Sequence, residues 1–113
     1  MSWLAFQTET HWQELLEASQ TKPQLLFKHS TRCSISSMVL HRFEGNDLLE
    51  SADISCWFLD LIAFRELSNF IAAETQVWHE SPQCIVLDKG QVIYAESHGA
   101  IDAKVIQSLI LNK

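Results

Sequence analysis

Two short apolar runs, each followed by apolar residues at helical spacing, constrain the fold more than any other feature of this sequence. Gln24–His29 (QLLFKH) follows a proline and is typical of a strand that is buried on both faces and central in its sheet. Residues 35–43 then keep helical spacing until Gly45-Asn46. Residues 54–61 (ISCWFLDL) form a second apolar run, and residues 64–71 follow it at helical spacing. Repeated strand-helix units favour parallel strands joined by right-handed crossovers.

The C-terminal part predicts an antiparallel hairpin and a last helix. Residues 84–87 and 92–95 are apolar, and the glycine of the intervening Asp88-Lys89-Gly90-Gln91 suits the positive φ of a hairpin loop. The helix spans residues 101–111, and its predicted inner face carries Ile101, Val105, Ile106, Leu109 and Ile110.

The N-terminal part predicts a short edge strand and a capped helix. Residues 3–6 form the strand, Thr10 and Gln13 form a capping box, and Lys22-Pro23 ends the helix. One face of this helix carries Trp12, Leu15, Leu16 and Ser19. The whole order, β-α-β-α-β-α-β-β-α, predicts an α/β, thioredoxin-like fold with a central mixed β-sheet flanked by helices.

The composition predicts one domain, residues 1–113, and excludes several classes of partner. Hydrophobic residues make up 47% and charged residues 19%, which excludes disorder, while three glycines and two prolines are too few for most all-β folds. A formal charge of -6 without a basic run makes nucleic acid a poor partner. No apolar run approaches the roughly 18 residues of a membrane span, and the N-terminus lacks a basic segment. We therefore expect no membrane association and a cytoplasmic location.

Cys33 is the candidate reactive residue among three cysteines, whose number and spacing predict neither a disulfide framework nor a zinc site. It lies where the central strand gives way to a helix, so the positive end of the helix dipole favours its thiolate. Arg32 and His29 are expected to add positive charge. A buried, inert cysteine is the alternative for Cys33 and the expectation for Cys56. Cys84 is predicted to be a buried strand residue, with a slow resolving role as its alternative.

Several motifs give the sequence a family resemblance. Residues 31–36 (TRCSIS) sit where thioredoxins carry C-x-x-C and monothiol glutaredoxins carry C-x-x-S, and Ser81-Pro82 sits where those folds place a cis-proline. Residues 28–33 (KHSTRC), 60–65 (DLIAFR) with 67–69 (LSN), and 79–83 (HESPQ) together resemble the YtxJ family of monothiol bacilliredoxins, from about Leu25 to the C-terminus. Two positions depart from that family: Ser34, where many members have proline, and Cys84, where an aliphatic residue is usual.

The resemblance implies monothiol chemistry around Cys33. Ser36 stands where a dithiol enzyme keeps its resolving cysteine, so an outside thiol must complete the reaction. Its hydroxyl is expected to bond either the backbone or the thiolate. A cis bond before Pro82 is implied to hold the Ser81 backbone beside Cys33, ready to pair with an extended substrate segment. The remaining residues expected to support the site are Thr31, Arg32 and Ser34.

Basic residues expected at the end of the sheet that carries Cys33 are candidates for binding a small thiol. Arg65 follows the strand at residues 54–61, at the carboxyl edge where ligands of open α/β sheets bind. The resemblance implies bacillithiol, whose malate offers carboxylates to a guanidinium; a salt bridge of Arg65 with Asp60 or Glu66 is the alternative. His29 and His79 are further candidates for the thiol site, although a structural hydrogen bond is the default for each, as it is for His98.

The predicted function is that of a monothiol thiol-disulfide oxidoreductase. It would reduce mixed disulfides between S-thiolated protein substrates and a low-molecular-weight thiol, with bacillithiol implied as co-substrate and no metal expected. Two alternatives stay open. One is an iron-sulfur or metal-binding module similar to monothiol glutaredoxins, in which Cys33 acts with His29 or His79. The other is a thioredoxin-like interaction domain whose cysteine is unreactive.

Overall fold

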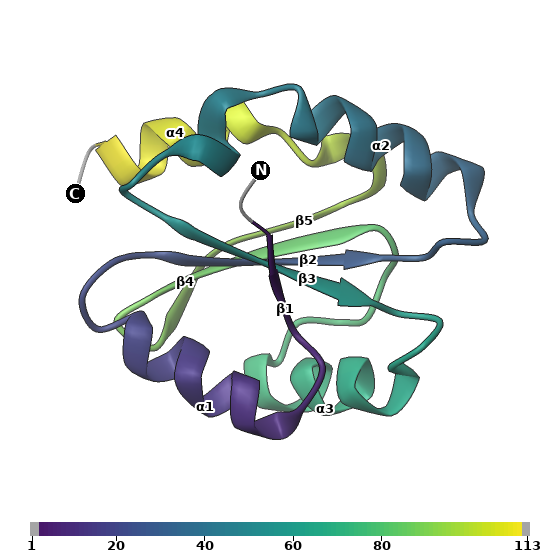
Figure 1. Cartoon of the computed structure of the whole chain (residues 1–113), viewed down its shortest axis with the longest axis horizontal. Helices are drawn as coiled ribbons and strands as arrows, with labels where there is room; N and C mark the ends of the chain where they lie inside the picture. The colour runs from purple at the N-terminus through teal and green to yellow at the C-terminus, as the bar shows by residue number, and fades with distance from the viewer. Residues whose placement is uncertain (1–2, 112–113) are drawn as a thin grey trace.

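Five strands form one mixed sheet in the computed structural model, which describes residues 3–111 (Figure 1). The strand order is β1-β3-β2-β4-β5, with β2 parallel to β3 and antiparallel to β4. The predicted edge strand, central strand and terminal hairpin are all confirmed. The strands are β1 (Trp3–Ala5), β2 (Gln24–His29), β3 (Ser55–Asp60), β4 (Gln83–Asp88) and β5 (Gln91–Ser97).

Helices cover both faces of the sheet (Figure 1). α1 (Glu9–Ala18) and α3 (Arg65–Thr75) lie on one face, and α2 (Ser34–Glu44) and α4 (Ala103–Leu111) lie on the other. Two short 3-10 helices, η1 (Asp47–Glu50) and η2 (His98–Ala100), follow α2 and β5. Within residues 3–111, no helix is both long and apolar enough to cross a membrane.

The central strands send alternate side chains into two hydrophobic cores, because successive residues of a strand point to opposite faces. Leu25 and Phe27 of β2 belong to the core beneath α2 and α4, and Leu26 belongs to the core beneath α1 and α3. The last two residues of β2 continue this alternation. Lys28 bonds to α3, whereas His29 bonds to α2.

The start of α1 corrects the prediction of its cap. The N-cap is Thr8 rather than Thr10, and its Oγ1 accepts a hydrogen bond from the His11 N–H at 3.2 Å. The His11 ring in turn accepts a hydrogen bond from the Gln7 N–H at 2.9 Å. A search for Glu or Gln at the third helical position overlooks this arrangement, because here a histidine accepts a backbone hydrogen bond from Gln7, the residue before the N-cap.

Two helices bury narrower faces than the spacing of their apolar residues predicts. Val105 and Leu109, both predicted on the inner face of α4, are 46% and 36% exposed, while Ile106 is fully buried. On α2, Ile35 and Met38 share the predicted helical spacing but are 54% and 69% exposed. Apolar side chains therefore remain on the surface of α2.

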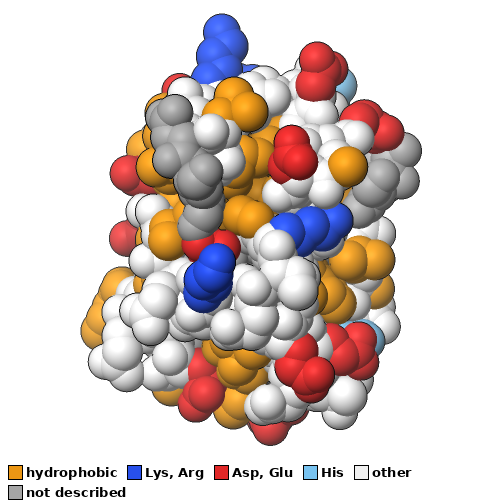
Figure 2. All heavy atoms as spheres, turned by 90° about the vertical axis from the view of Figure 1, so that its left-hand side faces the viewer, with side chains coloured by type: hydrophobic (Ala, Val, Ile, Leu, Met, Phe, Trp, Pro, Cys, Tyr) orange, Lys and Arg blue, Asp and Glu red, His pale blue; other side chains and the backbone are white. Residues whose placement is uncertain are grey.

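The strand directions bring the candidate residues to one edge of the sheet, meaning the edge formed by the ends of the strands and not by an outer strand. β2 and β3 end there, and β4 begins there, because Lys28 of β2 pairs with Gln83 of β4. α2 also starts at this edge (Figure 1). The opposite edge carries the β4-β5 turn, in which Gly90 has the expected positive φ of 77°. Figure 2 shows that side of the molecule, with scattered carboxylates between hydrophobic side chains and with Lys and Arg standing singly.

Candidate functional site

Cys33 is the N-cap of α2, directly after the loop that leaves β2. Its N–H donates to the Ser30 carbonyl at 3.2 Å, and its carbonyl accepts from the Ser37 N–H at 3.1 Å. These bonds fix the turn from strand to helix. The residue is partly exposed, at a helix N-terminus where unpaired N–H groups favour an anion. Its exposed neighbours are Thr31, Arg32 and Ser34.

The hydroxyl of Ser36 is engaged inside the protein. Ser36 is fully buried, and its Oγ accepts a hydrogen bond from the Ser30 N–H at 3.1 Å and lies 2.7 Å from His29 Nδ1. Of the two alternatives for this hydroxyl, the structure shows the bond to the backbone. Burial lowers the pKa of His29, although the carboxylates of Asp60 and Glu44 raise it. This burial works against the positive charge expected from His29 beside the thiol, and its Nδ1 faces the Ser36 hydroxyl.

The Ser81–Pro82 peptide bond is cis, as the resemblance implied. Pro82 directly precedes β4, and its carbonyl accepts a hydrogen bond from the His98 N–H at 2.9 Å. The Oγ of Ser81 is buried and has no hydrogen-bond partner among residues 3–111. Since β4 begins where β2 ends, this segment and Cys33 share one edge of the sheet.

Arg65 is the first residue of α3 and is exposed. Within the described part of the chain, no ion pair joins it to Asp60 or Glu66. The Asp60 carboxylate instead accepts hydrogen bonds from the N–H groups of Ile62 and Ala63, at 3.0 and 3.3 Å. The structure therefore does not show the salt bridge that was the alternative for Arg65.

Lys28 and Ser68 form a buried link that sequence reasoning missed. The Nζ of Lys28 donates to the Ser68 carbonyl at 3.2 Å, and the Ser68 Oγ lies 3.2 Å from Nδ1 of His79. Burial lowers the pKa of Lys28 to about 8. It also lowers the pKa of His79, and the positive charges of Lys28 and Arg65 lower it further. A lysine inside an otherwise apolar strand was the available signal, but its partner on α3 could not be read from the sequence.

The other two cysteines are buried strand residues in the core beneath α2 and α4. Burial raises the pKa of Cys56 to about 12 and the pKa of Cys84 well above its ordinary value. Thiols that stay protonated and shielded are poor nucleophiles. Across residues 3–111, no three His, Cys, Asp or Glu side chains are grouped so that they could hold a metal ion.

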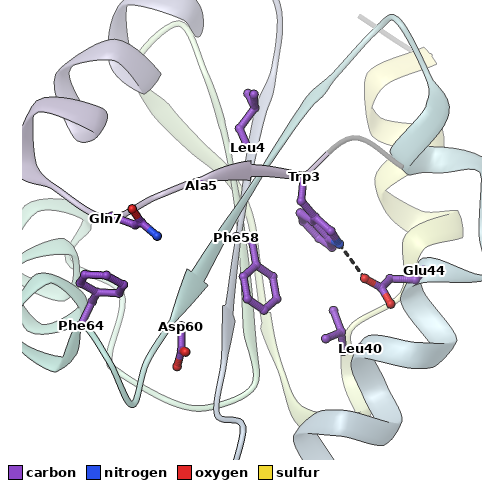
Figure 3. Close-up of a pocket in the computed structure, with 9 residues that line it drawn as sticks. All are labelled: Trp3, Leu4, Ala5, Gln7, Leu40, Glu44, Phe58, Asp60 and Phe64. Atoms are coloured by element: carbon purple, nitrogen blue, oxygen red, sulfur yellow. Dashed lines mark hydrogen bonds between the residues drawn. The ribbon is translucent and has the colours of Figure 1, made fainter.

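A cavity of about 480 Å³ lies beside β1 and β3, between α2 and the start of α3 (Figure 3). Its walls are mostly apolar, and Trp3 Nε1 donates a hydrogen bond to Glu44 at 2.7 Å along one side. Cys33 is not among the residues that line this cavity. The lining residues are Trp3, Leu4, Ala5, Gln7, Leu40, Glu44, Phe58, Asp60 and Phe64.

Comparison with known proteins gives a family match and several structural neighbours. The sequence model of the family described as monothiol bacilliredoxin BrxC matches residues 5–106. A solved structure described as a proposed oxidoreductase with a thioredoxin fold is 27% identical, with a TM-score of 0.79 over 93% of this chain and 90% of that chain. A mutant thioredoxin from Halobacterium salinarum is 17% identical, with a TM-score of 0.73 over 98% of this chain and 89% of that one. Thioredoxin from Fasciola hepatica is 15% identical, with a TM-score of 0.71 over 100% of both chains. These neighbours confirm the thioredoxin-like fold.

Proposed function

This chain belongs to the monothiol bacilliredoxin family, and from that premise we propose that it reduces mixed disulfides between protein cysteines and bacillithiol through Cys33. The family match and the thioredoxin-fold neighbours of the structure identify this chain as a thiol-disulfide oxidoreductase. One observation carries the assignment to Cys33, namely the contrast among the three thiols. Cys33 caps a helix and is partly exposed, whereas Cys56 and Cys84 are buried.

The proposed exchange has two steps. In the first, the Cys33 thiolate attacks the small thiol's sulfur in the mixed disulfide. A bond forms between Cys33 and the small thiol, the original S–S bond breaks, and the protein cysteine leaves as a thiolate that takes a proton from solvent. In the second, the thiolate of another small thiol attacks the same sulfur, releasing the Cys33 thiolate and an oxidised small-thiol dimer. The small thiol supplies the electrons, and Ser36, which has no sulfur, cannot resolve the intermediate.

Ser81 and Pro82 are the proposed contact for the polypeptide that carries the disulfide. Their backbone lies just before β4, at the sheet edge that also carries Cys33. An extended substrate segment can form main-chain hydrogen bonds with the backbone of this segment, which precedes the paired residues of β4, without requiring a particular sequence. The exposed Thr31, Arg32 and Ser34, which lie next to Cys33 in the chain, complete the proposed site.

Arg65 is proposed to bind a malate carboxylate of bacillithiol. It is exposed in the first turn of α3, and no carboxylate of residues 3–111 forms an ion pair with it. Replacing Arg65 with Ala should lower the rate with bacillithiol, relative to the rate with a neutral disulfide, about tenfold through loss of a charge-assisted hydrogen bond. Lys89→Ala, at the opposite edge of the sheet, is the control. An unchanged ratio in Arg65→Ala would place this residue outside the site.

Intact mass spectrometry tests the proposed function. The protein is incubated with oxidised bacillithiol and, separately, with oxidised glutathione. We expect a single bacillithiol adduct on the wild-type protein and on Cys84→Ala, and no adduct on Cys33→Ser. A wild-type protein that forms no adduct, or a Cys33→Ser protein that still forms one, would contradict the assignment.

A further inference from the structure

The cavity beside β1 and β3 combines aromatic and acidic walls. Trp3 and Phe58 both line it, with ring centroids 5.5 Å apart. Figure 3 shows the Phe58 side chain between the Trp3–Glu44 pair on one side and Phe64 on the other. Glu44 and Asp60 are the acidic residues of the lining, and among the described residues that line the cavity there is no lysine, arginine or histidine. A ligand in this cavity would therefore meet negative charge only.

Each of the two carboxylates is held in place through one of its oxygens. Glu44 Oε2 accepts a hydrogen bond from Trp3 Nε1 at 2.7 Å. Asp60 Oδ1 accepts from the N–H groups of Ile62 and Ala63, at 3.0 and 3.3 Å. Within residues 3–111, these carboxylates make no further hydrogen bond and no ion pair. The second oxygen of each is thus available to a donor from outside the chain.

We propose that this cavity binds a small organic cation, namely a primary ammonium group carried on an apolar body. The ammonium group donates to the available oxygens of Glu44 and Asp60, and the faces of aromatic rings attract the same charge. The apolar body packs against Leu40 and the aromatic rings of the lining. A cavity of about 480 Å³ with mostly apolar walls and two polar groups has the size and character of a small-molecule site.

The proposed site is separate from the thiol. Phe58 lies against His29, with ring centroids 5.6 Å apart, and the Nδ1 of His29 lies 2.7 Å from the Ser36 Oγ. The residues that line the cavity are thus one step removed from the turn that carries Cys33, and Cys33 itself is not among them. The proposal therefore does not rest on the proposed function, and binding can be measured without any disulfide exchange.

The binding test uses the whole protein at pH 7, with 2-phenylethylamine as the probe and NMR detection of the Trp3 indole N–H signal. The Trp3→Phe protein, which lacks this signal, assigns it. We expect saturable binding of one amine per chain with a shift of the signal, because this N–H is bonded to Glu44. 2-Phenylethanol has the same apolar body without the charge and should bind about tenfold more weakly. Methylammonium has the charge without the apolar body and should also bind at least about tenfold more weakly.

Two variants each remove one charge from the cavity and keep an oxygen for the internal hydrogen bonds. Asp60→Asn should weaken binding of the amine about tenfold, because this carboxylate is half-buried. Glu44→Gln should weaken it about threefold, because Glu44 is exposed and solvent screens its charge. Glu74→Gln is the matched control. It removes an exposed carboxylate of α3 that does not line the cavity, and it should bind the amine as the wild type does.

Three results would overturn the proposal. One is an equal affinity for 2-phenylethylamine and 2-phenylethanol, which would show that the cavity takes apolar bodies without regard to charge. Another is an equal loss of amine affinity in Asp60→Asn and Glu74→Gln, which would show that only the overall charge of -6 attracts the amine. The third is a Trp3 signal that the amine leaves unchanged. If Cys33 formed no bacillithiol adduct while the amine still bound, the proposed function would fail and this site would stand.

Discussion

Replacing Ser36 with alanine tests how the turn that carries Cys33 is held together. The buried Ser36 Oγ accepts a hydrogen bond from the Ser30 N–H at 3.1 Å and lies 2.7 Å from His29 Nδ1. Alanine fits the same space but has no oxygen. Two polar groups, the Ser30 N–H and the His29 ring nitrogen, then lose their shared partner inside the protein.

Two opposing effects set the size of the change in the free energy of unfolding. A buried polar group without a partner costs about 1–3 kcal/mol, so the two groups together cost about 2–6 kcal/mol before any relaxation. Alanine stabilises a helix relative to serine by about 0.5 kcal/mol, and Ser36 lies in α2. Entry of water or a small shift of the turn recovers part of the loss. We therefore expect the free energy of unfolding to fall by about 2–4 kcal/mol.

The assay is urea unfolding at pH 7, followed by tryptophan fluorescence. Ser37→Ala is the matched control, because Ser37 is the exposed neighbour on the same helix and should change the stability by no more than about 0.5 kcal/mol. A loss in Ser36→Ala no larger than in Ser37→Ala would refute the reasoning. A drop in exchange rate beyond the unfolded fraction would instead favour a bond between the Ser36 hydroxyl and the Cys33 thiolate.

Three further predictions concern the buried groups. Cys56→Ala and Cys84→Ala should retain disulfide exchange while losing about 1–2 kcal/mol of stability through a small cavity, and loss of exchange in Cys84→Ala would revive a resolving role for it. Burial lowers the pKa of His29 and His79 from 6.5, so the unfolded chain binds more protons and the free energy of unfolding should fall as the pH drops below about 6.5. Urea titrations at pH 7 and pH 5 measure this fall, which should be smaller in His29→Asn. Lys28 titrates at about 8 when folded and at 10.5 when unfolded, so its destabilising effect is fully present at pH 7 and fades as the pH rises from 8 to 10.5. Lys28→Met should therefore raise the free energy of unfolding at pH 7 by about 1–3 kcal/mol, and a loss of stability would show that the charge is paired.

The sequence predicts the strands and the position of Cys33 well because these depend on local patterns. The apolar run Gln24–His29 is bounded by Pro23 on one side and by polar residues on the other, and β2 has those bounds. Helical spacing begins again just after Cys33, so the junction follows from the change of period alone. The hairpin glycine, Gly90, is likewise a local signal with a backbone cause.

The sequence does not predict the contacts that join distant elements. Lys28 and Ser68 are separated by 40 positions, and their hydrogen bond depends on how α3 lies against the sheet. The burial of His29, which works against the positive charge expected from it beside the thiol, could not be read from the sequence for a related reason. Strand alternation turns His29 toward the buried Ser36, where desolvation favours its neutral form, and only the packed structure shows that depth of burial.

The central claim is that Cys33 accepts the small thiol and frees the protein cysteine, and a single-turnover experiment tests it most directly. A bacillithiol-modified protein is mixed with one equivalent of the enzyme in the absence of free small thiol, quenched in acid, and analysed by peptide mass mapping. We predict one bacillithiol on Cys33 for each protein thiol released, with Cys56 and Cys84 unmodified. A disulfide between Cys33 and the protein substrate, a Cys33–Cys84 disulfide, or bacillithiol on a different cysteine would contradict the account.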